Sequence, residues 1–177
     1  MTTNDHAASG SRAAPGGVEI RPVTIDDLET LIDIYLDTAR HHAAIEAEVW
    51  HVPAREDIAA RLRPRIEGRG PTSEYVVAIV DGEAAGSASV HLDDPPTPGN
   101  MLRAVPSAEF GVSVVEGFRG RGIGRALIAH LEQWAAERGA KRMVLNVSSA
   151  NEGAIRLYED LGYREYDRAM LKPLVPR

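Results

Sequence analysis

Residues 112–131 read VSVVEGFRGRGIGRALIAHL, and this stretch decides the fold. It opens with the β-branched run 112–115, which predicts a strand, and continues with the glycine- and arginine-rich loop 119–124. Apolar residues then recur every three or four positions from Ile123 to Trp134, which is typical of one face of a helix. The stretch therefore predicts a strand–loop–helix unit with glycines at the start of the helix.

The loop of this unit suits an anionic ligand. The first N–H groups of a helix have no partner within the helix, and they carry a partial positive charge of roughly +0.5. Glycines let phosphate oxygens approach that backbone closely, and Arg119, Arg121 and Arg125 add forked donors that match phosphate geometry. A phosphate-bearing ligand is therefore predicted.

Three phosphate-binding patterns compete for this loop. A P-loop requires G-x-x-x-x-G-K-[ST], and the loop contains no lysine. A dinucleotide fingerprint requires G-x-G-x-x-G, but the glycines fall at positions 120, 122 and 124 and Arg125 stands where the last should be. The third pattern, R/Q-x-x-G-x-G/A, fits Arg119, Gly122 and Gly124. A glycine-rich turn without a ligand is the structural alternative.

Composition limits the class of protein. The 177 residues allow one domain with a sizeable core, and 44% hydrophobic and 26% charged residues are ordinary for a globular protein. The net charge of −6 argues against a nucleic-acid partner, and no apolar run is long enough to span a membrane. Without cysteine there is no disulfide and no thiolate site. The N-terminus lacks the apolar core of a signal peptide, so a cytoplasmic location is expected.

The chain predicts one domain, 18–177, behind a disordered tail of residues 1–17, which are small, polar and rich in glycine and proline. The expected strands are 18–21, 75–80, 83–92, 109–115, 142–147, 163–166 and 169–174, with a loop at 93–100. The expected helices start at Thr24, Ala54, Ile123 and Asn151, and Pro64 should end or kink the second. The two strands of the strand–helix–strand unit from 109 to 147 should pair in parallel. An α/β fold follows, with a mixed sheet and helices on both faces.

A second motif lies downstream of the loop. Residues 151–163 read NEGAIRLYEDLGY and fit N-x-x-A-x-x-L-Y-x-x-x-G-F/Y. With both motifs, the chain resembles the GNAT superfamily of N-acetyltransferases over roughly residues 109–166. The resemblance implies a GNAT-like fold with a mostly antiparallel sheet and one splayed parallel strand pair. It also implies direct transfer of an acetyl group from acetyl-CoA to a primary amine of a small molecule or peptide. Members are often dimers, so a homodimer is a hypothesis.

The resemblance also implies roles for individual residues. Tyr158 would protonate the leaving thiolate, and Glu109 is the candidate general base. The expected cofactor-binding residues are Val112, Val114, Arg119, Gly120, Arg121, Gly122, Ile123, Gly124, Arg125, Asn146 and Asn151. Each polar candidate has a plain structural alternative: a core tyrosine, a strand-end glutamate, a turn residue for Asn146 and a helix N-cap for Asn151. Alternation along the strand places Glu109, Gly111 and Ser113 on one face of small residues that leaves space for a ligand.

A second polar cluster and two other functions stay open. The cluster comprises His41, His42, Glu46, Trp50 and His51. The resemblance implies that it lines the acceptor pocket. Its alternatives are a solvated connection and a metal site, and no metal is expected. The other functions are a non-catalytic acyl-CoA-binding or sensing module on the same fold and a nucleotide-phosphate binder.

Overall fold

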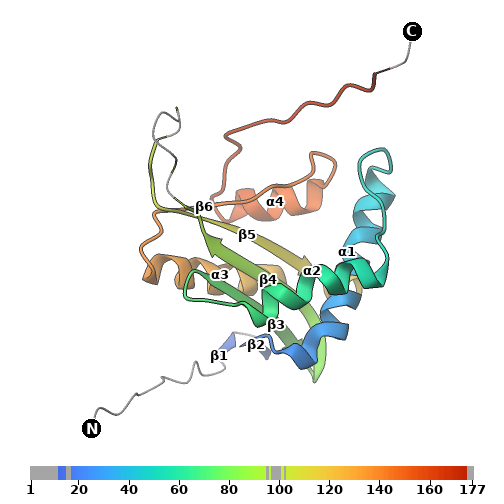
Figure 1. Ribbon diagram of the computed structural model, residues 1–177, viewed down its shortest axis with the longest axis vertical. Coiled ribbons are helices and arrows are strands. Elements are labelled where there is room, and N and C mark those ends of the chain that lie inside the picture. Colours follow the sequence, from blue (N-terminus) through green and yellow to red (C-terminus); the bar gives the residue numbers. More distant parts are fainter. Residues whose placement is uncertain (1–11, 15–16, 95, 97–100, 102, 175–177) are drawn as a thin grey trace. The chain divides into compact units, whose positions relative to one another are not determined.

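A six-stranded sheet forms the centre of the first part of the chain (Figure 1). The computed structural model describes residues 12–14, 17–94, 96, 101 and 103–174, which fall into two compact units divided after Asn146. The strands of the first unit lie in sequence order: β1 (Arg12–Ala14), β2 (Val18–Pro22), β3 (Ser73–Val80), β4 (Glu83–Leu92), β5 (Ser107–Val114) and β6 (Arg142–Val144). All neighbours are antiparallel except β5 and β6, which are parallel. The mixed, mostly antiparallel sheet is thus confirmed.

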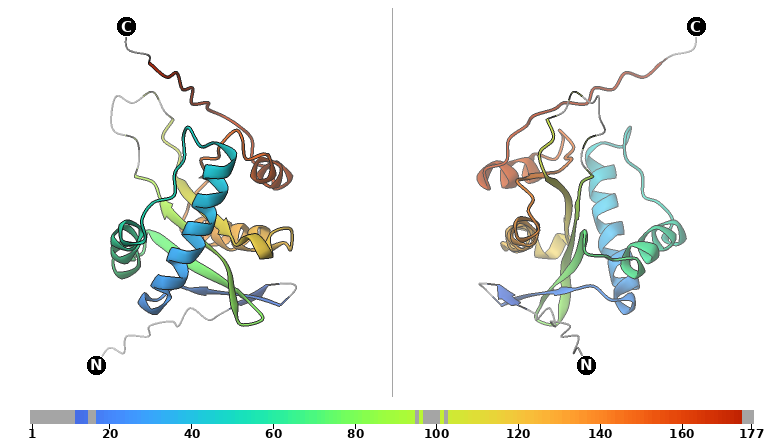
Figure 2. Two further views of the ribbon diagram at one scale, coloured as in Figure 1. Left: turned by 90° about the vertical axis from the view of Figure 1, so that its right-hand side faces the viewer. Right: turned by 60° about the vertical axis from the view of Figure 1, so that its left-hand side comes forward.

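Helices cover both faces of this sheet (Figure 2). Helices α1 (Leu28–Ile45) and α2 (Arg55–Glu67) lie on one face, and α3 (Ile123–Glu137) lies on the other. The inward stripe of α3 places Leu127, Ile128 and Leu131 at 0% exposure. Burying each such side chain contributes about 1.5–3 kcal/mol. The predicted helical periodicity after the loop is therefore confirmed by the packing of α3.

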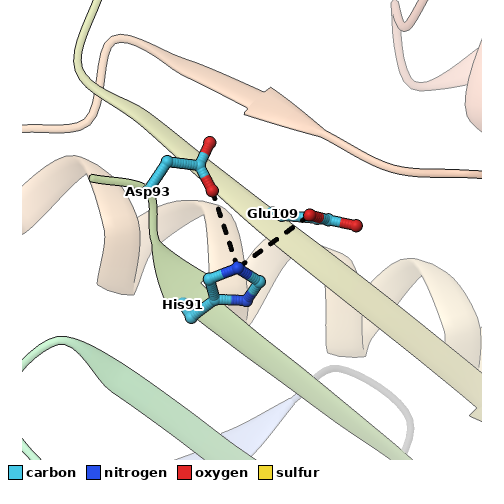
Figure 3. Close-up of side chains that lie close together, drawn as sticks. All are labelled: His91, Asp93 and Glu109. Carbon is cyan, nitrogen blue, oxygen red and sulfur yellow. Dashed lines mark ion pairs between the residues drawn. The ribbon is translucent and has the colours of Figure 1, made fainter. Parts of the chain in front are cut away.

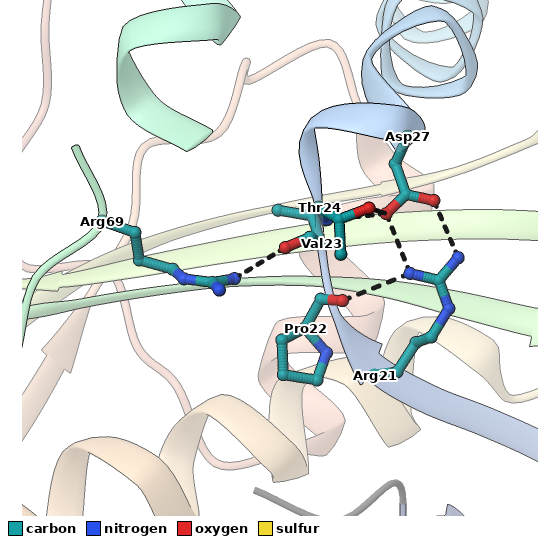
Figure 4. A network of polar contacts seen from close by, with 6 residues as sticks. All are labelled: Arg21, Pro22, Val23, Thr24, Asp27 and Arg69. Atoms are coloured by element: carbon teal, nitrogen blue, oxygen red, sulfur yellow. Dashed lines mark hydrogen bonds and ion pairs between the residues drawn. The ribbon is translucent and has the colours of Figure 1, made fainter. Parts of the chain in front are cut away.

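A polar network fixes the entry to α1 (Figure 4). The guanidinium of Arg21 donates to both carboxylate oxygens of Asp27, at 2.8 and 2.7 Å. The backbone N–H of Thr24 donates to the same carboxylate at 2.7 Å, which satisfies a donor at the start of the 3-10 turn η1 (Ile25–Asp27). Arg69 donates to the carbonyl of Val23 at 2.9 Å. The pKa of the Asp27 carboxyl lies below its usual value, and the main cause is the hydrogen bond from Arg21.

Pro64 does not end α2, although the sequence led us to expect that it would end or kink the helix. The helix continues to Glu67, and the N–H of Gly68 still donates to the carbonyl of Pro64 at 2.8 Å. The carbonyl that loses a partner to proline belongs to Ala60, which is exposed and can be hydrated. Burial of Ile66 holds the turn beyond the proline on the core.

Two other regions differ from expectation. The predicted strands 163–166 and 169–174 are absent from the described residues, because the alternating apolar residues there bury no face: Met170 is 93% exposed and Leu174 is 87% exposed. Strand β1 lies within the predicted tail, whose residues 1–11 and 15–16 lie outside the described part. Most of the predicted loop 93–100 lies outside it as well.

The second unit, which follows Asn146, contains helix α4 (Glu152–Asp160). The side chain of Asn151 accepts a hydrogen bond from the N–H of Ala154 at 3.2 Å, so the predicted N-cap is confirmed. Gly162 follows the helix at a φ of +90°, a conformation that favours glycine. Within the described residues of both units, we find no helix with the length and apolar character needed to cross a bilayer.

Candidate functional site

Strand β5 runs past the end of its parallel neighbour. The pairing with β6 covers only Ser107 to Glu109, whereas β5 continues to Val114 and stays paired with β4 along that length. Val112 and Val114 therefore lie on a stretch that β6 does not pair with. An extended ligand can add to such a strand edge through backbone hydrogen bonds. This is the short parallel contact expected of a splayed strand pair.

The loop after β5 turns directly into α3. A 3-10 turn, η2 (Glu116–Phe118), leads to Gly120 and Gly122, which adopt φ angles of +74° and +81°. Gly122 is the N-cap of α3, and its carbonyl accepts from the N–H of Ala126 at 3.0 Å. A Cβ built at either glycine would meet no atom within 4 Å. Backbone conformation, rather than crowding by the protein, therefore requires glycine here.

The open space beside these glycines adjoins the first N–H groups of α3. Residues in the first turn of a helix have no carbonyl four positions back within the helix, so their N–H groups can bind an anion. Ile123 and Gly124 occupy that turn. The structure thus places open space beside the first turn of a helix, and phosphate binding there stays a prediction.

The arginines of the loop differ in what they contact. The guanidinium of Arg119 donates through Nη2 to Oδ2 of Asp37 at 2.9 Å and through Nε to the carbonyl of Val114 at 3.0 Å. Its Nη1 lies 3.2 Å from Nδ1 of His41. Arg121 instead lies over the ring of Phe118, 5.1 Å from its centre. The side chain of Arg119 is therefore directed to α1, a partner that sequence analysis missed.

Glu109 lies in a charged group near the N-terminal end of β5 (Figure 3). Nε2 of His91 is 3.9 Å from the Glu109 carboxylate and 3.6 Å from that of Asp93. On the other side, the amide of Asn146 donates to Oε1 of Glu109 at 3.1 Å. The structure thus joins the candidate base to Asn146, which was predicted to contact the cofactor, and to two residues that sequence analysis did not select.

The group formed by His91, Asp93 and Glu109 could hold a metal ion, since one ligand atom from each lies within 4.8 Å of the others. The site is largely exposed, and exposed acidic groups are common without an ion, so we assign no metal to it. Its chemistry equally suits an ammonium group, because two carboxylates flank a single imidazole. No sequence spacing reveals it, because β4 and β5 bring the residues together from positions 91 to 109.

The face of small residues predicted around Glu109 is confirmed by the strand register. Across β4 and β5, Ser87 faces Ser113, Ser89 faces Gly111 and His91 faces Glu109, and these pairs alternate with those that face α3. They continue the face of β3 that carries Val77, which packs with the core residues of α1 and α2. The small polar face of β5 therefore lies on the side of the sheet that α1 and α2 cover.

The histidine cluster at the end of α1 is divided between two environments. His42 lies 4.9 Å from the ring of Trp50, and its Nδ1 is buried without a hydrogen-bond partner in the described part of the chain. Burial is the largest cause of the lowered pKa of His42, so its ring is neutral at neutral pH. His41 instead contacts Arg119. Among the described residues, these histidines form no group with metal-ligand spacing.

Tyr158 lies in the second unit, on α4. Its ring makes an edge contact with that of Tyr163, with 6.0 Å between the centres. Burial raises the pKa of the Tyr158 hydroxyl, so the group stays protonated at neutral pH. A protonated phenol can donate a proton, as the predicted role requires.

The sequence of this chain is similar to the sequences of known acetyltransferases. Residues 28–163 match the acetyltransferase (GNAT) family. Streptothricin acetyltransferase of Streptomyces lavendulae is 36% identical over 98 residues, 55% of this chain and 48% of that protein. Aminoglycoside N(6')-acetyltransferase type 1 of Salmonella typhimurium is 29% identical over 94 residues, 53% of this chain and 64% of that protein.

The fold has solved counterparts as well. The structure of the aminoglycoside N-acetyltransferase AAC(6')-Iy in complex with CoA superposes with a TM-score of 0.66 and 21% identity. The match covers 93% of this chain and 96% of the other. By contrast, the alignments with the two curated relatives cover only about half to two thirds of their lengths.

Proposed function

Because the chain belongs to the acetyltransferase (GNAT) family, we propose that it transfers an acetyl group from acetyl-CoA to a primary amine. The observation that carries this proposal is the backbone cradle at the start of α3, where Gly120 and Gly122 adopt positive φ beside open space. The pyrophosphate of acetyl-CoA is the ligand that this cradle suits. The AAC(6')-Iy structure, which is in complex with CoA, supports the choice of cofactor.

The proposed cofactor path follows β5. With the pyrophosphate on the loop, the pantetheine arm would extend along the stretch of β5 that continues past β6, bonded to the backbone at Val112 and Val114. A backbone N–H on this stretch of β5 would then stabilise the oxyanion of the tetrahedral intermediate. The remaining cofactor contacts are proposed for Gly120, Arg121, Gly122, Ile123, Gly124, Arg125 and, from the second motif, Asn151.

The proposed chemistry is a direct transfer within a ternary complex. Glu109, directly or through water, takes a proton from the acceptor ammonium, and the neutral amine nitrogen attacks the thioester carbonyl. Collapse of the tetrahedral intermediate breaks the carbon–sulfur bond, and Tyr158 protonates the departing thiolate. The second proton of the amine nitrogen passes to water, or to Glu109 once Glu109 has released the first proton to solvent. Solvent reprotonates Tyr158, which leaves an amide and free CoA.

The acceptor class we propose is a cationic small-molecule amine. The two carboxylates beside His91 supply negative charge near the N-terminal end of β5, where Glu109 lies. The relatives named for streptothricin and for aminoglycosides support small amine-bearing acceptors. A peptide amine is the alternative acceptor. A homodimer and a cytoplasmic location remain proposals from the family resemblance and the composition.

A CoA-release assay across amine classes tests this function. Wild-type protein should release CoA from acetyl-CoA with at least one class among polyamines, aminoglycosides, amino acids and peptides, above the rate without amine. Glu109→Gln should reduce turnover, most at lower pH where the amine is protonated, and should leave acetyl-CoA affinity unchanged. Glu83→Gln, at the exposed start of β4, is the matched control and should behave as wild type.

Two outcomes of this assay would contradict the proposal. Tight binding of acetyl-CoA without CoA release for any amine would favour a non-catalytic acyl-CoA-binding module. Binding of ATP in preference to acetyl-CoA in calorimetry would favour a nucleotide-phosphate binder.

A further inference from the structure

The first residue of the loop motif is tied to a helix far away in sequence. Arg119 stands 82 residues from Asp37, yet their side chains form an ion pair at 2.9 Å. The pair is partly buried, with 34% of the Arg119 side chain and 23% of the Asp37 side chain exposed. Water screens an ion pair less where the side chains are partly shielded from it.

The contact uses the donors of the guanidinium in several directions. Nη2 bonds to Asp37, Nε bonds to the carbonyl of Val114, and Nη1 points at Nδ1 of His41. Since a guanidinium only donates, Nδ1 of His41 accepts, and the proton of that ring lies on Nε2. Asp37 and His41 are four residues apart on α1 and thus share one face of the helix. One arginine therefore joins α1, the end of β5 and the start of the loop.

These contacts distinguish two roles for Arg119, which are to bind the phosphate with its side chain or to hold the loop in place. A side chain that bound phosphate would present its donors to the open space beside Gly120 and Gly122. The donors that the structure pairs, one each on Nε, Nη1 and Nη2, instead face protein atoms on α1 and β5. The side chain therefore acts on the loop from behind, while the backbone of the loop faces the ligand.

We propose that Asp37 is a positioning residue for cofactor binding. Through Arg119 it holds residues 119–122 in the conformation that presents the start of α3 to the pyrophosphate. This inference rests on the proposed function, because it takes acetyl-CoA as the ligand of the loop. It adds that α1, which covers the side of the sheet with the small polar face of β5, sets the affinity for the cofactor.

The test compares Asp37→Asn with a control on the same helix. Asp33→Asn removes a pair that Asp33 makes with Arg55 of α2, one turn earlier on α1. Acetyl-CoA affinity is measured by calorimetry and folding by thermal unfolding. Asp37→Asn should weaken acetyl-CoA binding by about tenfold, because the ligand must then order a loop that Arg119 no longer holds in place. Asp33→Asn should bind as wild type, with a similar unfolding midpoint.

Two further readouts separate positioning from a general structural effect. At saturating acetyl-CoA, kcat of Asp37→Asn should stay close to wild type while the KM for acetyl-CoA rises, since only the free loop is misplaced. The double variant Asp37→Asn/Arg119→Ala should bind no more weakly than Arg119→Ala alone, because both changes remove the same contact.

The outcomes distinguish this inference from the function on which it rests. If wild-type protein binds no acetyl-CoA, the proposed function falls and the inference falls with it. If wild type binds but Asp37→Asn binds equally well, or if the two single losses add in the double variant, only the inference is overturned.

Discussion

Replacing Gly122 by alanine distinguishes the contribution of this glycine to stability from its contribution to ligand binding at the start of α3. The residue is the N-cap of the helix at a φ of +81°, and a Cβ there would project into open space. A side chain at positive φ costs about 1–2 kcal/mol. The lower chain entropy of unfolded alanine offsets about 0.4–1 kcal/mol of that cost. The net loss of stability should be small, and the added methyl group should mainly obstruct the ligand.

Gly139 offers a matched control at the other end of the same helix. It follows α3 at a φ of +88°, and a Cβ there would likewise meet nothing within 4 Å. Gly122→Ala and Gly139→Ala should therefore lower the unfolding midpoint by a similar amount, about 2–4 °C per kcal/mol for a chain of this size. Only the Gly122 methyl group would lie where the pyrophosphate is proposed to bind.

Calorimetric titration with acetyl-CoA distinguishes the two variants. Gly122→Ala should weaken binding by about tenfold or more, which corresponds to about 1.4 kcal/mol. Gly139→Ala should bind acetyl-CoA as wild type does. If both folded variants keep wild-type affinity, the start of α3 is not the pyrophosphate site, and the reasoning from its backbone geometry is refuted.

Three further variants test other parts of the account. Tyr158→Phe should lower kcat by about 10²-fold or more with little change in the KM for acetyl-CoA, because proton donation to sulfur acts in the transition state. Steady-state kinetics measures both constants. A fully active variant would show that Tyr158 only packs and does not donate a proton. Asp27→Asn should lower the unfolding free energy by about 1.5–3 kcal/mol at neutral pH in denaturant titrations. Arg21 is the main cause of the lowered pKa of Asp27 in the folded state, so the ionised carboxylate stabilises the fold at pH values above its unfolded pKa. The difference in unfolding free energy between wild type and Asp27→Asn should therefore shrink as pH falls through the folded pKa. A difference that does not change with pH would contradict this. Leu131→Ala should cost about 2–5 kcal/mol in the same titrations, because Leu131 is fully buried, and a smaller loss would mean that the core collapses around the change.

The local patterns of the sequence predicted the elements around the site well. The strand, the loop glycines and the helix after them all follow from β-branched runs, glycine spacing and apolar periodicity, which are properties of neighbouring residues. The alternation that groups Glu109 with Gly111 and Ser113 also held, because the register with β4 preserves it. Asn151 proved to be a helix cap for the same local reason.

Contacts between distant segments could not be predicted in this way. Arg119 was expected at a phosphate because arginine suits phosphate, and that contact stays a prediction. Its ion pair with Asp37, on a helix in the other half of the chain, could not be predicted from local patterns. The pairing of His91 with Glu109 depends on strand register, which the sequence does not state. At the C-terminal end, alternation predicted strands where Met170 and Leu171 remain exposed, since a pattern predicts a strand only where a partner covers one face.

The central claim is that acetyl-CoA binds on the loop and helix start that follow β5. Amide hydrogen exchange, with and without acetyl-CoA, locates the bound ligand on the backbone itself. We expect acetyl-CoA to slow exchange in peptides that cover residues 112–126, and CoA, which carries the same pyrophosphate, to do the same. Unchanged exchange in these peptides at saturating acetyl-CoA, with protection elsewhere in the chain, would contradict the account.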